Sequence, residues 1–154
     1  MFQIVLHRPE IPPNTGNIIR LSANTGATLH LIHPLGFSMD HARLRRAGLD
    51  YREYADVREH ADFDAYLETG QPDRLFALSG SGAVRYTECS FRAGDAFLFG
   101  PESVGLEDRL LAHRAVTGVL RIPMLPERRS INLANAVAIV LFEAWRQLGF
   151  PRGV

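Results

Sequence analysis

Short runs of apolar residues alternate along the chain with longer segments in which apolar and polar residues mix. A short apolar run bounded by glycine, proline or small polar residues predicts a buried strand, and apolar residues three or four positions apart predict a helix. On these criteria the sequence predicts strands over 3–6, 27–32, 75–78, 96–99 and 116–122. It predicts helices over 14–26, 40–48, 62–69, 106–112 and 130–147.

Strands that alternate with helices are typical of an α/β fold with a largely parallel sheet and flanking helices. The 154 residues are enough to bury a core of ordinary size, and no repeat or linker divides them, so we expect a single domain over 1–154. Pro12 and Pro13 disfavour both helix and strand. The first helix is therefore expected to begin after them, with Asn14 or Thr15 as its cap.

The last predicted helix, over 130–147, is apolar on most of its circumference, and its polar residues form one narrow stripe of Asn132, Asn135, Glu143 and Arg146. Such a helix is buried in a core or against another subunit. Ser130 is expected to cap the free N–H groups of its first turn. A polar loop that leads into a capped, buried helix can hold an anionic or polar ligand.

Three predicted strands end in segments rich in glycine, proline and small polar residues, at 78–82, 99–105 and 122–130. Because ligands bind outside the carboxyl ends of parallel strands, these segments are expected to converge on one pocket. The first segment contains Gly80 and Gly82 in a GxG pattern, but it lacks the third glycine that opens a helix in dinucleotide-binding folds. A dinucleotide is therefore not the expected ligand.

All 17 basic residues are arginine, which excludes any mechanism that needs a lysine, such as a Schiff base or an ATP-binding P-loop. The 17 acidic residues bring the formal net charge to zero, which argues against a DNA-coating protein but not against a local basic patch for RNA. Cys89 is the single cysteine, and the six histidines show no zinc-binding spacing. We therefore expect no metal.

The longest apolar run, 136–142, is far too short to cross a bilayer. The N-terminal segment lacks the basic start and apolar core of a signal peptide. These two features predict a cytoplasmic protein that has no membrane partner.

Three segments together resemble the SPOUT superfamily of RNA methyltransferases. The first reads NTGNIIR at 14–20 and is similar to the family's N-x-G-x-x-x-R motif. The second reads LFGPESVGL at 98–106, and the third combines IPM at 122–124 with RSINLANA at 129–136. The three occur in the family's order with compatible spacing, and the resemblance extends over nearly the whole chain. The resemblance implies a C-terminal deep trefoil knot over roughly 75–150, which periodicity alone would not predict.

Within the superfamily, the short chain and its opening segment FQIVLHRPEIPPNTGNIIRL are most similar to the minimal branch that modifies tRNA. This resemblance implies S-adenosylmethionine-dependent methylation of the ribose 2′-hydroxyl of the wobble nucleotide, cytidine or modified uridine 34, in leucine tRNAs. It also implies a homodimer that binds the anticodon stem-loop. Two alternatives stay open: an enzyme of the same fold that methylates another tRNA or ribosomal RNA position, and a non-catalytic RNA-binding factor.

The resemblance places the cofactor among the knot loops, where backbone groups hold most of it. The matching positions for cofactor binding are Leu78, Gly100, Gly105, Ile122, Met124 and Ser130. The two glycines are expected there because backbone can approach a ligand closely where no Cβ intrudes. The alternative is that both glycines only form turns.

Arg20 matches the family's arginine that activates the ribose hydroxyl or positions the substrate. An arginine stays protonated in essentially any site. We therefore expect a guanidinium that clamps the phosphate beside the target ribose, rather than a free base. The alternative is a surface charge with no catalytic task.

A further set of residues is expected to contact RNA or to shape its site: Asn14, Glu102, Arg129, Asn135, Arg43 and Arg46. Asn14 would otherwise cap its helix or contact a partner subunit. Glu102 would orient its own loop through backbone amides or contact bound ligand, and Asn135 would satisfy a buried polar stripe. The two arginines of the helix over 40–48 would contact the anticodon stem or form a solvated face.

Overall fold

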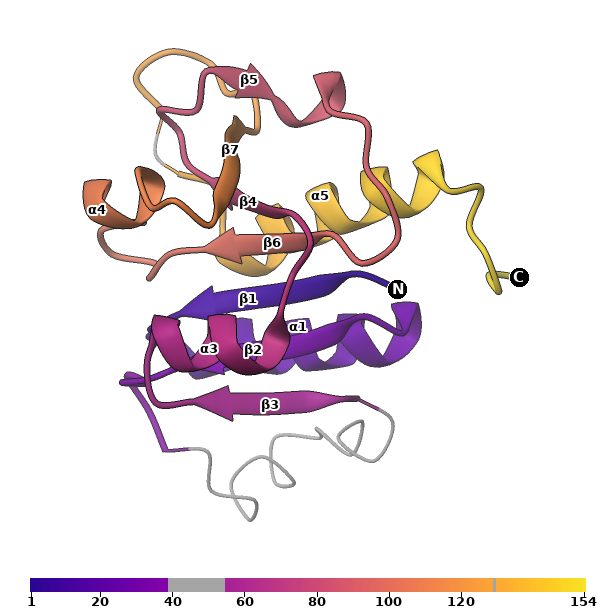
Figure 1. The fold of residues 1–154 in the computed structure, drawn as a ribbon. Helices are drawn as coiled ribbons and strands as arrows, with labels where there is room; N and C mark the ends of the chain where they lie inside the picture. Colours follow the sequence, from indigo (N-terminus) through magenta and orange to yellow (C-terminus); the bar gives the residue numbers. More distant parts are fainter. Residues whose placement is uncertain (39–54, 129) are drawn as a thin grey trace.

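The computed structural model describes residues 1–38, 55–128 and 130–154. At its centre lies a seven-stranded sheet of order β3-β2-β1-β6-β4-β7-β5, in which every neighbouring pair is parallel (Figure 1). The α/β fold with a largely parallel sheet is thereby confirmed. The strands are β1 Gln3–His7, β2 Thr28–Ile32, β3 Val57–His60, β4 Leu75–Leu78, β5 Val84–Arg85, β6 Ala96–Phe99 and β7 Val116–Arg121.

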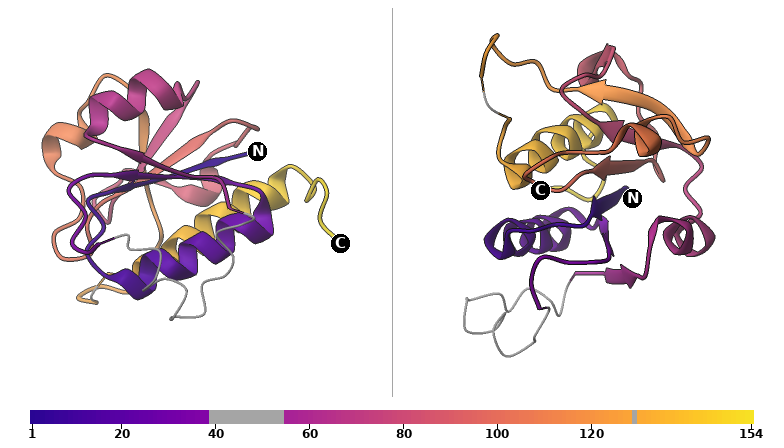
Figure 2. Two further views of the ribbon diagram at one scale, coloured as in Figure 1. Left: turned by 90° about the horizontal axis from the view of Figure 1, so that it is seen from below. Right: turned by 90° about the vertical axis from the view of Figure 1, so that its left-hand side faces the viewer.

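Helices cover both faces of the sheet. In the described part of the chain, α1 and α5 lie side by side on one face, and α3 and α4 lie on the other (Figure 2). A 3₁₀ turn, η2, follows β5. The helices are α1 Pro12–Thr25, α3 Phe63–Gly70, α4 Asp108–Leu111 and α5 Leu133–Gln147, and η2 is Tyr86–Glu88.

The sheet divides the core into two apolar clusters, because successive side chains of a strand point to opposite faces. Ile4 and Leu6 of β1 pack in the cluster that contains Val137 of α5. Val5, which lies between them in sequence, packs in the cluster that contains Tyr66 of α3. Two buried faces explain why the central strands are apolar without alternation.

The strands β3 and β5 were not predicted, and both lie at the edges of the sheet. The central residues of β3, Arg58 and Glu59, are exposed, and both residues of the short β5 are exposed. An edge strand that is covered on fewer sides needs no apolar run. The apolar signal used for the central strands is therefore absent from these two.

The start of α1 corrects two expectations. The helix begins at Pro12, so the prediction that both prolines precede it is wrong. Proline suits this first turn, where a backbone N–H has no intrahelical acceptor. The N-cap residue is Ile11, and it makes no side-chain cap bond. Asn14 and Thr15 instead lie buried inside the first turn, so neither is the predicted cap.

The start of α5 corrects a third expectation. The helix begins at Leu133, and its cap is Asn132, whose side-chain oxygen accepts hydrogen bonds from the N–H groups of Ala134 and Asn135. Ser130 lies upstream of this cap, so its predicted capping role is wrong. The helix predicted over 40–48 lies outside the described residues. Within the described ranges, no helix is long and apolar enough to cross a membrane.

Candidate functional site

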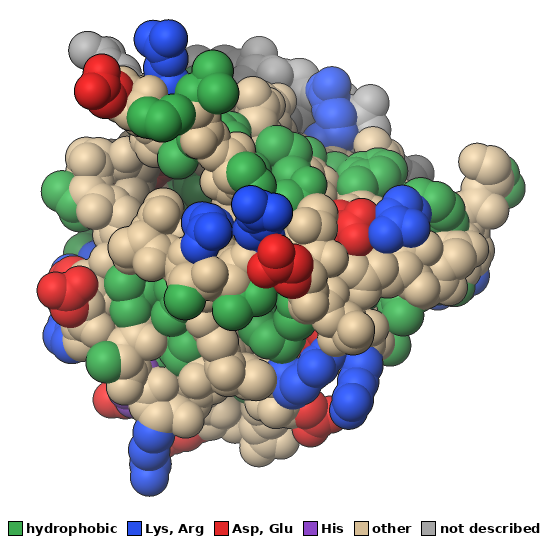
Figure 3. All heavy atoms as spheres, turned by 90° about the horizontal axis from the view of Figure 1, so that it is seen from above, with side chains coloured by type: hydrophobic (Ala, Val, Ile, Leu, Met, Phe, Trp, Pro, Cys, Tyr) green, Lys and Arg blue, Asp and Glu red, His purple; other side chains and the backbone are tan. Residues whose placement is uncertain are grey.

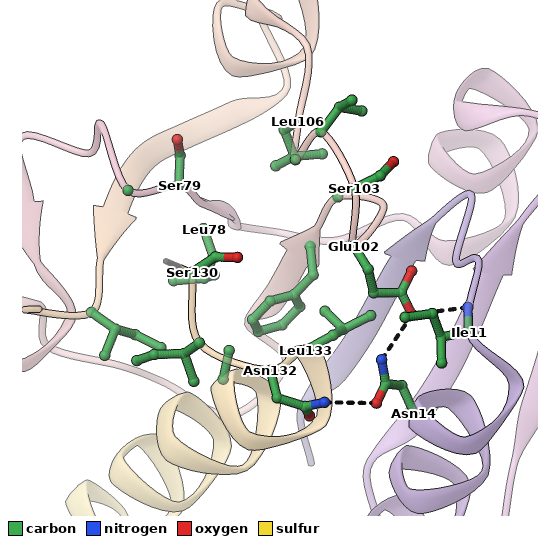
Figure 4. Close-up of a pocket in the computed structure, with 18 of the residues that line it drawn as sticks. Ile11, Asn14, Leu78, Ser79, Glu102, Ser103, Leu106, Ser130, Asn132 and Leu133 are labelled. Carbon is green, nitrogen blue, oxygen red and sulfur yellow. Dashed lines mark hydrogen bonds between the residues drawn. The ribbon is translucent and has the colours of Figure 1, made fainter. Parts of the chain in front are cut away.

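A pocket of about 520 Å³ lies at the carboxyl ends of β4, β6 and β7, beside the N-termini of α1 and α5 (Figure 4). All three strand-end segments contribute to its wall, as the sequence predicted. The lining residues are Ile11, Asn14, Leu78–Gly80, Phe99, Gly100, Glu102–Leu106, Ile122, Met124, Ser130–Leu133 and Ala136.

The wall of this pocket combines an apolar surface with a few polar side chains. A cavity of this size and character is typical of a site for a small organic ligand. The larger apolar side chains are those of Ile11, Leu78, Phe99, Val104, Leu106, Ile122, Met124, Ile131 and Leu133. The polar side chains are those of Asn14, Ser79, Glu102, Ser103, Ser130 and Asn132.

Most of the predicted site residues meet at this pocket. All six predicted cofactor positions line it, and so do Asn14 and Glu102. Arg20 and Asn135 do not line it, and both are exposed, on α1 and α5 respectively. The remaining predicted RNA contacts, Arg43, Arg46 and Arg129, lie outside the described residues.

The two glycines of the loop after β6 have different structural tasks. A Cβ on Gly100 would lie 2.3 Å from the carbonyl carbon of Gly105 and 2.4 Å from the nitrogen of Leu106. Its absence therefore makes room for the loop's own backbone. Gly105 has a φ of 72°, which favours glycine, and a Cβ there would meet nothing within 4 Å. The loop's own backbone thus explains both glycines, and both also line the pocket, so their role toward a ligand stays a prediction.

Glu102 binds the segment that leads into α1 from a distant part of the chain. Its Oε2 accepts a hydrogen bond from the Glu10 N–H at 2.7 Å, and its Oε1 accepts one from the Ile11 N–H at 3.1 Å. A carboxylate at a helix N-terminus is also favoured by the helix dipole. Glu102 therefore holds backbone amides of another segment, and not those of its own loop as one expectation had it.

Two asparagines extend this contact to α5. The Asn14 amide nitrogen donates to Oε1 of Glu102 at 3.1 Å, and its oxygen accepts from the Asn132 amide nitrogen at 2.9 Å (Figure 4). Asn132 in turn caps α5. One hydrogen-bonded chain thus joins the three segments that carry the motif resemblance, at one side of the pocket.

Glu10 belongs to the same cluster, although no sequence pattern predicted a role for it. Its carboxylate accepts hydrogen bonds from the Ser103 N–H at 2.9 Å and from the Ser103 hydroxyl at 2.8 Å. Glu10 and Ser103 are far apart in sequence, so no local pattern links them. The available signal was only an acidic residue just ahead of a helix that begins with two prolines.

A second cavity, of about 330 Å³, lies at the carboxyl ends of β1 and β2. Its two arginines, Arg8 and Arg109, both contact Glu107, which neutralises much of their charge. Burial and the neighbouring Arg8 lower the pKa of His7 in its wall, so this ring is neutral at pH 7. Among the described residues, no group of three histidine, cysteine, aspartate or glutamate side chains could hold a metal ion.

The face of the molecule that carries β5 bears interspersed charges. Arginines, acidic residues and exposed apolar side chains alternate across it, and no large area has a single sign (Figure 3). This agrees with the formal net charge of zero. An electrostatic attraction to RNA would therefore have to come from local contacts rather than from this whole face.

Comparisons with known proteins agree on one family. A model described as the SpoU rRNA Methylase family matches residues 1–142. The tRNA (cytidine(34)-2′-O)-methyltransferase of Burkholderia cenocepacia is 56% identical over 155 residues, covering 99% of each chain. A solved structure described as giving insights into the 2-OH methylation of C/U34 on tRNA is 47% identical, with a TM-score of 0.88 and 97% of each chain covered.

A more distant solved structure, the AdoMet-bound rRNA methyltransferase of Sinorhizobium meliloti, is 26% identical with a TM-score of 0.81. The matched region covers 96% of this chain and 56% of the relative's chain. Together these matches confirm the family to which the three sequence segments pointed.

Proposed function

The chain belongs to the SpoU rRNA Methylase family and is a methyltransferase, and we propose that it methylates the ribose 2′-hydroxyl of nucleotide 34 of tRNA. The observation that carries this proposal is the similarity to a cytidine-34 methyltransferase over 99% of both chains. All three pocket-forming segments lie within this similarity. We further propose that the substrate is leucine tRNA, recognised through its anticodon stem-loop, and that cytidine or a modified uridine is accepted.

The proposed methyl donor is S-adenosylmethionine. The pocket fits it, because the cavity of about 520 Å³ offers apolar walls for a heterocyclic base and polar side chains near the start of α5 for the charged end. Leu78, Ile122 and Leu133 would contact the base, and Ser79 and Ser130 would contact polar atoms. When bound, this cofactor supplies a methyl group already activated by its sulfonium. The AdoMet-bound relative supports the assignment.

The protein's own contribution would be to position the ribose and to assist loss of the hydroxyl proton. Glu102 is poorly suited as the base, because its carboxylate already accepts three hydrogen bonds from backbone and amide groups. The Arg20 guanidinium would clamp the phosphate beside the target ribose. We therefore propose that Glu102 stabilises the structure of the site and that Arg20 contacts the substrate.

The position of Arg20 favours a homodimer. Arg20 is exposed on α1 and does not line the pocket of its own chain. A catalytic role of Arg20 is then most simply explained if it contacts the pocket of a second copy of the chain. The exposed apolar side chains of Ile11 on the α1 start and Phe142 on α5, each 44% exposed, offer a surface for such pairing. We also propose the trefoil knot over roughly 75–150 and a cytoplasmic location, both by family resemblance.

Nucleoside mapping of tRNA from a deletion strain tests the substrate. Leucine tRNAs that lack the 2′-O-methyl group at position 34 in the deletion strain, and regain it when the gene is restored, would support the proposal. Unchanged methylation at that position would refute it. Calorimetric titration of the purified protein with S-adenosylmethionine tests the cofactor separately, because it needs no RNA.

A second candidate function is methylation of ribosomal RNA. The description of the matching family model and the rRNA methyltransferase among the similar structures favour it. Mapping ribosomal RNA from the same deletion strain distinguishes the two, because only one of the RNA classes should lose a methyl group.

A further inference from the structure

One wall of the pocket is a short loop after β6, residues 101–105, which we term the pocket loop. Ser103, Val104 and Gly105 of this loop line the pocket, and Val104 is 78% exposed. The base of the loop is held by its own turn, in which the Gly105 N–H donates to the Pro101 oxygen at 2.9 Å. The close approach of its backbone to Gly100 supports the base as well.

The tip of the pocket loop is held by hydrogen bonds to a different segment of the chain. Within the described residues, the hydrogen bonds of the Glu102 carboxylate and of Ser103 lead to the segment at the start of α1. Glu102 accepts the Glu10 N–H, and the Glu10 carboxylate accepts both the N–H and the hydroxyl of Ser103. The two carboxylates thus make reciprocal contacts. Glu102 accepts a hydrogen bond from the backbone of Glu10, and Glu10 accepts one from the backbone of Ser103, the residue after Glu102.

Glu10 is itself well anchored. A Cβ on Gly36 would lie 2.8 Å from the Glu10 Cα, and the Gly36 N–H donates to the Pro9 oxygen at 2.9 Å. The backbone of Glu10 therefore packs closely against Gly36, while its side chain contacts Ser103 of the pocket loop. Glu10 does not line the pocket and is not part of either apolar cluster.

We propose that Glu10 is a positioning residue that holds the pocket loop in its ligand-binding conformation and so sets the affinity for the cofactor. This inference rests on the proposed function, since the ligand of the pocket is taken to be S-adenosylmethionine. Glu10 acts through Ser103 and touches neither cofactor nor RNA. Loss of its carboxylate frees the loop tip on one side and adds an ordering cost to ligand binding.

Calorimetric titration of the full chain with S-adenosylhomocysteine, a product that needs no turnover, tests this role. Glu10→Ala is expected to weaken binding about tenfold, because two hydrogen bonds to a charged acceptor are lost. Glu10→Gln keeps one acceptor oxygen and should give an intermediate affinity. The matched control is Glu107→Gln, which changes an exposed carboxylate just beyond the same loop, and it should stay within about twofold of the unmodified protein.

Kinetics and a double variant separate positioning from catalysis and from mere folding. With Glu10→Ala, the KM for the cofactor should rise, while kcat at saturating cofactor and the melting temperature should change little. In a Ser103→Ala background, the effect of Glu10→Ala on affinity should shrink, because the two residues act together. Unchanged affinity in Glu10→Ala, or a fall in kcat at saturating cofactor with KM unchanged, would overturn the inference. If the unmodified protein itself binds no S-adenosylhomocysteine, the proposed function fails instead.

Discussion

A buried histidine pair on two adjacent strands of the sheet should make the stability of this protein depend on pH. His30 of β2 and His60 of β3 are 1% and 7% exposed, and Nδ1 of His30 lies 2.9 Å from Nε2 of His60. His60 Nδ1 lies 3.1 Å from the Thr69 hydroxyl, which donates to the Ala65 oxygen. The network is satisfied when both rings are neutral and each Nδ1 carries the proton.

The sign and size of the effect follow from the pKa of His30. Burial, with smaller effects from His60 and Arg58 that outweigh Asp56, lowers this pKa from 6.5 to about 4. The unfolded chain therefore binds a proton between pH 6.5 and pH 4 that the folded protein does not, and stability falls as the pH falls through this window. At about 1.4 kcal/mol per pH unit, the loss reaches about 3 kcal/mol. Burial also lowers the pKa of His60, with the same sign.

Urea denaturation at pH 7, 6, 5 and 4.5, followed by the fluorescence of Trp145, measures this loss. His30→Gln removes the titrating ring and keeps a polar side chain, so its free energy of unfolding should fall less over this range than that of the unmodified protein. His33→Gln, which removes a half-exposed ring, is the matched control and should follow the unmodified protein. Parallel curves for His30→Gln and the unmodified protein would refute the reasoning.

Three further predictions concern the stability of the fold and the activity of the site. Asp95→Ala should lower the free energy of unfolding by about 3 kcal/mol in urea denaturation at pH 7. The reason is that its 2%-exposed carboxylate accepts two hydrogen bonds from Arg74, at 2.8 and 2.6 Å, and one from the Arg92 N–H. Asn132→Ala removes the cap of α5 and should cost about 1 kcal/mol in the same assay. Arg20→Ala should abolish methyl transfer to tRNA and leave the calorimetric affinity for S-adenosylmethionine within a few-fold. A collapse of cofactor binding in that variant would place Arg20 in the pocket instead.

The central strands β4 and β6 could be predicted closely from the sequence because each is a short, wholly apolar run between turn residues. The bounds of β4 and β6 agree with the predicted 75–78 and 96–99. The edge strands β3 and β5 could not be predicted in this way, because their exposed side chains need not be apolar. The start of α1 differs from the predicted one because proline, although unfavourable inside a helix, is well suited to its first turn.

The convergence of three strand ends on one pocket was predictable from the rule that ligands bind at the carboxyl edge of a parallel sheet. The hydrogen bonds that hold the pocket together were not. Glu102 lies 88 residues from Asn14, and Asn132 lies 118 residues from Asn14, so no local periodicity connects them. Ser130 and Asn132 are both residue types that commonly cap helices, so the local sequence does not decide between them.

The chain of polar contacts from Glu102 to α5 has a fixed direction, and this explains why amides occupy its two middle positions. The Glu102 carboxylate accepts hydrogen bonds from its neighbours, so Asn14 presents its nitrogen to Glu102 and its oxygen to Asn132. Asn132 must then donate with its nitrogen, which leaves its oxygen for the free N–H groups of Ala134 and Asn135. Aspartate at position 14 could not donate to Glu102, and leucine could do neither task. One carboxylate thereby sets the orientation of both amides and joins the starts of α1 and α5 at the rim of the pocket.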